Sequence, residues 1–98
     1  MERFSSRTLD ELGRLVLHSE LRQMLGLDTG DKVSLTLVGT IVILQCTEGD
    51  IEPGYAVSQV SDLGVIDLPR EYRETLGWKE KDKIALYHTD NVVILKAA

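Results

Sequence analysis

The fold is decided by residues 9–27, which read LDELGRLVLHSELRQMLGL, because the same pattern returns at residues 60–78 as VSDLGVIDLPREYRETLGW. Shifting the sequence by 51 positions aligns residues 7–45 with residues 58–96 without a gap, and 13 of the 39 aligned pairs are identical. A repeat at a fixed spacing indicates one structural unit used more than once. We therefore expect a single domain with repeat one at about residues 6–46, a linker at about 47–54 and repeat two at about 55–98.

Each repeat begins with a pattern typical of a tight β-hairpin. In repeat one, two short stretches between Arg7 and Val16 flank the sequence Glu11-Leu12-Gly13. The matching turn in repeat two is Asp62-Leu63-Gly64. Glycine can supply the positive φ that such a turn needs, so the sequence predicts a hairpin at the start of each repeat.

A short helix is predicted next in each repeat, over about Ser19–Leu25 and about Pro69–Leu76. Ser19 is a residue type that caps helix N-termini, and Pro69 suits a first helical turn because its missing N–H is not needed there. Gly26 and Gly77 follow the two helices, where a left-handed residue commonly ends a helix. We expect both helices to stop at these glycines.

A second hairpin is predicted after each helix, from β-branched and apolar runs joined by two-residue turns. The expected strands are Val33–Val38 with Ile41–Cys46, joined by Gly39-Thr40, and Ile84–Thr89 with Val92–Lys96, joined by Asp90-Asn91. Each repeat is then a ββαββ unit of about 40 residues, too small to bury a core alone. The sequence predicts a mostly β fold with two short helices, in which the two units interlock.

The charge of the chain does not by itself indicate a nucleic-acid ligand. Sixteen acidic residues outnumber 11 basic ones, which gives a net charge of -5 and a pI of about 4.9. The arginines are nevertheless concentrated in the early part of each half, and arginine is the side chain suited to forked contacts with phosphates and guanine edges. The position of the arginines is therefore more informative than their number.

Other global features point to an intracellular protein without catalytic chemistry. No apolar run is long enough to span a bilayer and no secretory signal is present, so we expect a cytoplasmic location. The single cysteine, Cys46, is expected to be a half-buried strand residue. No nucleotide-binding, metalloprotease or serine-hydrolase motif occurs. We expect no enzyme activity, no cofactor and no metal site.

The run from Leu9 to Leu27 resembles the N-terminal domain of the AbrB (SpoVT-AbrB) family, whose pattern is D-E-L-G-R, two hydrophobic residues, I-P-x-E-L-R-x-x-L-G-I. Residues 60–78 look like a more divergent copy, so the chain resembles two tandem AbrB units. The resemblance implies a swapped-hairpin β-barrel, in which two ββαββ units exchange hairpins. We expect one chain to supply both halves, with a barrel swapped between two chains as the alternative.

The resemblance also implies which side chains contact DNA. Carried over position by position, they are Arg7 on the first strand, Arg14 after the turn glycine and Arg22 in the helix. In repeat two, Ser58 and Val65 replace the first two, and only the third is kept, as Arg73.

A further arginine, Arg70, stands where repeat one has Ser19. We expect it to be a surface charge at the start of the helix, with partial compensation for these losses as the alternative. The candidate DNA-binding set is therefore Arg7, Arg14, Arg22, Arg70 and Arg73.

Three functions follow as hypotheses. The leading one is a bacterial-type transcription regulator that binds double-stranded DNA, with self-association into a homodimer left open. A MazE-like antitoxin is disfavoured, because only Ala97 and Ala98 follow the last expected strand and no segment is left to wrap a toxin. The third is an AbrB-fold module for protein interaction or oligomerisation that does not bind DNA, as the acidic charge and the missing arginines of repeat two suggest.

Overall fold

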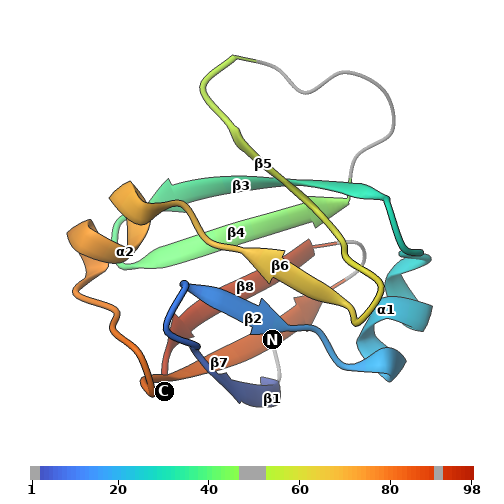
Figure 1. The fold of residues 1–98 in the computed structure, drawn as a ribbon, viewed down its shortest axis with the longest axis horizontal. Helices are drawn as coiled ribbons and strands as arrows, with labels where there is room; N and C mark the ends of the chain where they lie inside the picture. Colours follow the sequence, from blue (N-terminus) through green and yellow to red (C-terminus); the bar gives the residue numbers. More distant parts are fainter. Residues whose placement is uncertain (1–2, 47–52, 90–91) are drawn as a thin grey trace.

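The fold is described from a computed structural model, over residues 3–46, 53–89 and 92–98 (Figure 1). Both repeats have the predicted element order ββαββ. The elements of repeat one are β1 (Arg3–Thr8), β2 (Arg14–Val16), α1 (Ser19–Leu25), β3 (Lys32–Val38) and β4 (Ile41–Cys46). Those of repeat two are β5 (Ala56–Gln59), β6 (Val65–Asp67), α2 (Arg70–Leu76), β7 (Lys83–Thr89) and β8 (Val92–Ala97). The protein is thus mostly β with two short helices, as predicted.

The two repeats exchange their first strands. A six-stranded antiparallel sheet has the order β1-β7-β8-β4-β3-β5, so β1 pairs with a strand of repeat two and β5 pairs with a strand of repeat one. The predicted second hairpins, β3–β4 and β7–β8, are confirmed and meet at the sheet centre through β4 and β8. A separate two-stranded sheet pairs β2 with β6, again across the repeats.

The larger sheet is open, which corrects the expectation of a closed β-barrel. Its edge strands β1 and β5 are not paired with each other in the described part of the chain. The predicted first hairpins are also absent as ladders, because β1 and β2 belong to different sheets. In the turn between β1 and β2, Asp10 Oδ1 accepts hydrogen bonds from the backbone N–H groups of Leu12 (2.9 Å) and Arg14 (2.8 Å). This turn diverts the chain out of the larger sheet.

The helix boundaries differ slightly from those predicted at their N-terminal ends. Ser19 is the first helical residue of α1, not its cap, and the N-cap position is occupied by His18, whose side chain makes no capping bond. Pro69 holds the same place before α2, with ψ of 139°, so this helix begins at Arg70. The predicted glycine stops are confirmed, since Gly26 and Gly77 both adopt the left-handed conformation after their helices.

A single hydrophobic core is shared by the repeats. Most buried positions of one copy are also buried in the other, and Leu35 and Leu44 of repeat one are matched by Leu86 and Leu95 of repeat two, all at 0% exposure. Because the two-stranded sheet lies in front of the larger sheet with α1 and α2 at opposite ends, its inner side chains join this core (Figure 1). Each repeat therefore buries its apolar strands against the other, as expected.

The predicted Asp90-Asn91 turn lies outside the described residues, and so does most of the predicted linker at 47–54. Within the described chain, Cys46 is half-buried at the end of β4, as predicted, and burial followed by the charge of Asp31 raises the pKa of its thiol. No helix in residues 3–46, 53–89 and 92–98 is long and apolar enough to cross a membrane.

Candidate nucleic-acid interface

The two-stranded sheet of β2 and β6, called here the β2–β6 ribbon, forms the centre of the candidate interface. Its register pairs Arg14 with Asp67 and Leu15 with Ile66. Leu15 and Ile66 are buried in the core, whereas Arg14, Asp67 and Val16 are exposed. Because alternate residues of a strand face opposite sides, the ribbon presents one face to the core and the other to solvent.

One arginine from each helix lies over the turn of the opposite repeat. The Nε–H of Arg22 donates to the carbonyl oxygen of Leu17 at 3.2 Å, and its guanidinium lies so close to Gly64 that a Cβ there would be 2.6 Å from Nε. Arg73 repeats this arrangement, donating to Leu68 at 3.2 Å and covering Gly13. The backbone N–H of Leu17 also bonds to Gly64, and that of Leu68 to Gly13, both at 2.9 Å.

Arg22 and Arg73 differ from Arg14 and Arg70 in how their charge is balanced. Among the residues that the structure describes, no carboxylate lies within ion-pair distance of Arg22 or Arg73. Both side chains are half-buried and held in place through Nε. Within the described residues, the two amino groups of each guanidinium make no hydrogen bond to the protein. The positive charges are therefore fixed in position and not neutralised locally.

Arg7 lies in β1 and contacts the segment just after β2. Its Nη2 lies 2.8 Å from Nδ1 of His18, a geometry in which the guanidinium donates and the neutral imidazole accepts. Burial and then the charge of Arg7 lower the pKa of His18 below its ordinary value of 6.5, while Glu20 opposes them. Within the described chain, Arg7 Nε is buried without a hydrogen-bond partner. Arg7 is thus less accessible than the sequence suggests.

Arg14 is exposed on the ribbon but already has an acidic partner. Its Nε lies 2.7 Å from Oδ2 of Asp10, with side-chain exposures of 44% and 37%. Desolvation acts to raise the pKa of Asp10, but the hydrogen bonds from Arg14 and Leu12, together with the charge of Arg14, leave it below its ordinary value. An ion pair this exposed is weak and open to exchange with another anion.

Arg70 lies apart from the ribbon. It is the first residue of α2 and pairs through Nε with Glu74 at 2.9 Å, with both side chains largely exposed. The structure therefore gathers four of the five predicted arginines around the β2–β6 ribbon, through their contacts with its turns and flanking segments, and leaves the fifth on the helix.

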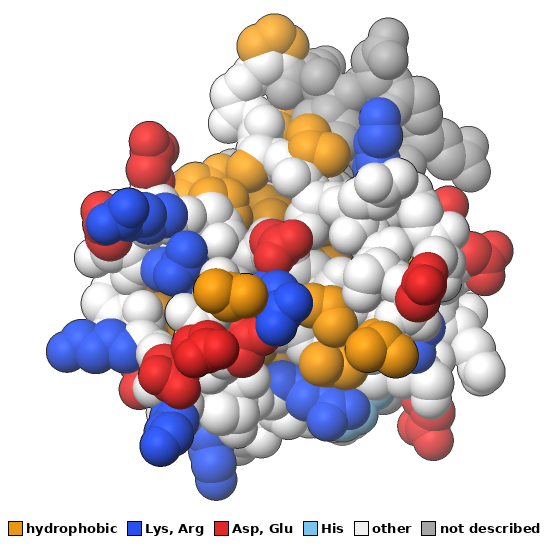
Figure 2. All heavy atoms as spheres, viewed as in Figure 1, with side chains coloured by type: hydrophobic (Ala, Val, Ile, Leu, Met, Phe, Trp, Pro, Cys, Tyr) orange, Lys and Arg blue, Asp and Glu red, His pale blue; other side chains and the backbone are white. Residues whose placement is uncertain are grey.

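The sequence reasoning missed an apolar component of this surface. Leu12, Leu63 and Val16 are 60%, 77% and 41% exposed, respectively, and all lie on the ribbon or its turns. Figure 2 shows hydrophobic, basic and acidic side chains interleaved over the face that carries the ribbon. The identity of Leu12 and Leu63 in the two repeats was a usable signal, because a leucine at a turn tip is not needed for the core.

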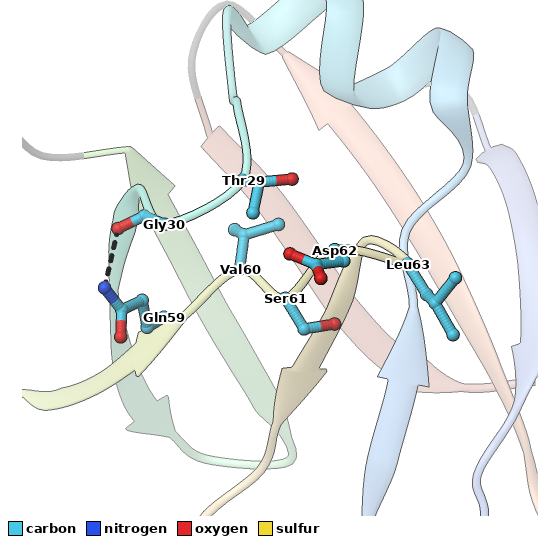
Figure 3. Close-up of a pocket in the computed structure, with 7 residues that line it drawn as sticks. All are labelled: Thr29, Gly30, Gln59, Val60, Ser61, Asp62 and Leu63. Atoms are coloured by element: carbon cyan, nitrogen blue, oxygen red, sulfur yellow. Dashed lines mark hydrogen bonds between the residues drawn. The ribbon is translucent and has the colours of Figure 1, made fainter.

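A shallow hollow of about 570 Å³ borders the ribbon (Figure 3). It is lined by the turn after α1 and the segment between β5 and β6, and its residues are Thr29, Gly30, Gln59, Val60, Ser61, Asp62 and Leu63. The amide of Gln59 is occupied by a 2.9 Å hydrogen bond to the carbonyl of Gly30. The lining has one charged side chain, a carboxylate, so this hollow is not suited to an anionic ligand.

The described residues contain no group of three or more His, Cys, Asp and Glu side chains that could hold a metal ion. No protein-family model matches the chain, and no curated protein matches it. Among solved structures, the chain is similar to the solution structure of PHS018 from Pyrococcus horikoshii, with a TM-score of 0.57 and 22% identity over 99% of this chain and 94% of that chain. With so few identical residues, this likeness concerns the fold alone.

Proposed function

We propose that this protein binds duplex DNA as a transcription regulator of the AbrB type, through the solvent face of the β2–β6 ribbon. The observation that carries the proposal is the pair Arg22 and Arg73. Two guanidinium groups without acidic partners in the described chain flank one short twisted ribbon, in a protein whose net charge is -5. Forked, pre-positioned donors of this kind suit phosphate oxygens and base edges.

The exchange of strands between the repeats supports the same proposal. Pairing of β1 with β7 and of β5 with β3 is the connectivity that a swapped-hairpin arrangement requires. In this proposal Arg14 lies at the centre of the interface and changes partners from Asp10 to a DNA phosphate. Arg7 contributes mainly by positioning the segment around His18.

The test is binding to a pool of random duplexes over a range of salt concentrations. We expect affinity to fall as salt rises, and Arg14→Ala to weaken binding and reduce the log–log slope by about one. The matched control is Lys96→Ala, because Lys96 lies on β8 with the alternation opposite to that of the core residues Val93 and Leu95. An Arg14→Ala variant with unchanged affinity and slope would remove the ribbon from the proposal.

A second candidate function is self-association through the same face. It is favoured by the exposed side chains of Leu12 and Leu63, because exposed apolar groups suit burial against a protein surface better than contact with a large charged ligand. Sedimentation of the wild type and of a Leu12→Ser, Leu63→Ser variant distinguishes the candidates. If the face is an oligomer interface, the wild type sediments as a dimer and the doubly substituted variant as a monomer. The wild type then shows no duplex binding at low salt.

A further inference from the structure

A second hollow lies along α2 and the turn that follows it, and it shares Arg73 with the candidate interface at the ribbon. Its volume is about 290 Å³, and we call it the α2 pocket. Its lining residues are Arg70, Arg73, Glu74, Gly77, Trp78 and Lys79. Three of these carry a positive charge and one a negative charge, although the chain as a whole has a net charge of -5.

The positive charges of the α2 pocket are only partly balanced. Glu74 is engaged by Arg70 through the 2.9 Å ion pair, so one cation and the one carboxylate offset each other. Arg73 is anchored on the carbonyl of Leu68, and Lys79 uses its backbone N–H, not its side chain, to hold Asp82 at 2.8 Å. In the described residues, neither Arg73 nor the ammonium group of Lys79 has a carboxylate within ion-pair distance.

The equivalent hollow of repeat one provides an internal comparison. It has about 370 Å³ and is lined by Ser19, Arg22, Gln23, Gly26, Leu27 and Asp28. One cation and one carboxylate replace the three cations and one carboxylate of the α2 pocket. In Figure 2, Lys and Arg side chains are interleaved with Asp and Glu side chains on the α2 side, whereas acidic side chains predominate on the α1 side. The fold is the same, so the difference is one of side-chain chemistry.

We propose that the α2 pocket binds a phosphate group. A guanidinium fork and an ammonium group that lack carboxylate partners suit an oxyanion, and the indole of Trp78, 7% exposed, forms an apolar wall. Pockets for whole small molecules usually have about 300–1,000 Å³, so a volume at the lower end suits one phosphate group with a small part of its parent molecule. The inference does not require that the protein bind DNA.

The intrinsic fluorescence of Trp78, the only tryptophan of the chain, provides the test. The probe is inorganic phosphate, titrated at constant ionic strength against chloride. We expect a saturable change in the emission of Trp78 and a shift of its indole N–H resonance with phosphate, and neither with chloride. A response that is linear, or equal for both salts, overturns the proposal.

Substitutions that copy repeat one test the pocket without disturbing the fold. Lys79→Asp introduces the residue found at Asp28, whose N–H holds Asp31 at 2.8 Å in the same turn geometry. We expect Lys79→Asp to weaken phosphate binding by about tenfold or more, since a charged hydrogen bond is lost and a like charge introduced. Arg70→Ser is the second variant, with an expected weakening in the same direction. Undiminished binding in both variants contradicts the proposal.

A control variant and a comparison with duplex binding show whether the effect is specific and whether DNA or a free molecule supplies the phosphate group. Gln23→Ala in the repeat-one hollow should leave the Trp78 response unchanged. If DNA supplies the group, phosphate competes with duplex and Lys79→Asp lowers the salt slope by about one. If a free phosphorylated molecule supplies it, Lys79→Asp weakens phosphate binding and leaves duplex binding unchanged. Saturable phosphate binding without any duplex binding supports the pocket and refutes the proposed DNA-binding function.

Discussion

Gly13 and Gly64 each support an arginine that comes from the other repeat. Their φ angles of 78° and 77° lie in the left-handed region, which side chains other than glycine adopt at a cost of about 1–2 kcal/mol. In addition, a Cβ at either position would overlap Arg73 or Arg22. The same contact, between a turn glycine of one repeat and a helical arginine of the other, therefore occurs twice in the molecule.

We predict that Gly64→Ala destabilises the protein more than Gly26→Ala. Gly26 has a similar φ of 67° with open space around it, so it isolates the backbone strain. The additional loss at Gly64 comes from displacing Arg22 from the carbonyl of Leu17, a charged hydrogen bond worth about 1.5–3 kcal/mol. Urea unfolding of both variants measures the difference, and equal losses would show that the arginine contact is energetically unimportant.

His18 predicts a pH dependence of stability. Because burial and Arg7 lower its pKa below 6.5, the folded protein takes up this proton less readily than the unfolded chain. The associated stabilisation is present above pH 6.5 and is lost as the pH falls through the lowered pKa. Asp10, whose pKa is below 3.8, stays ionised above pH 5 and does not contribute in this range.

The free energy of unfolding is therefore expected to fall between pH 7 and pH 5. His18→Gln should flatten this part of the profile, since an amide oxygen can accept from Arg7 without titrating. His88→Gln is the control and should retain the part of the decline that His18 causes. A decline of the same size in wild type and His18→Gln would assign the pH dependence to another group.

A tyrosine side chain links helix α2 to a strand of the opposite repeat through a hydrogen bond. Tyr72 stands where α1 has the buried Leu21, and its hydroxyl donates to the carbonyl oxygen of Leu35 in β3 at 3.0 Å. Tyr72→Phe is expected to cost about 1 kcal/mol, the usual net value of such a bond. Tyr55→Phe, at an exposed position, should stay within about 0.5 kcal/mol of wild type. Thermal unfolding of the two variants distinguishes the two outcomes.

The sequence predicted the second hairpins and the glycine-stopped helices because these are local structures. Ile41–Cys46 pairs with its neighbour in the chain, and Gly26 ends α1 through its own backbone. The prediction of the first hairpins was wrong because β1 and β2 pair with distant strands and not with each other. Turn composition at Glu11-Leu12-Gly13 predicts a reversal of the chain but does not say which strands it places side by side.

For the candidate site, the sequence identified the arginines but did not predict their hydrogen-bond and ion-pair partners. Arg7 and Arg22 are both basic residues of repeat one, yet Arg7 contacts His18 and Arg22 lies over Gly64 of repeat two. Which arginine is neutralised depends on acids such as Asp10 and Glu74, and their geometry follows from the folded turn and helix. The asymmetry of the two hollows, in contrast, can be read directly from the aligned repeats.

At the scale of the whole molecule, both repeats depend on the same core. Each supplies strands that pair only with the other, and the buried leucines of one repeat pack with those of its copy. Arg22 and Arg73 are each anchored on a carbonyl of their own repeat and lie over the turn glycine of the other repeat. The candidate interface therefore exists only when both halves are folded together.

The most direct test is to separate the halves as fragments 1–50 and 51–98 and to record circular dichroism and solution mass for each alone and for their mixture. We predict that neither fragment folds as a monomer, and that mixing restores a folded one-to-one complex with cooperative unfolding. A fragment that folds alone as a stable monomer, with the strand content of half the protein, would contradict the interlocked core on which the account rests.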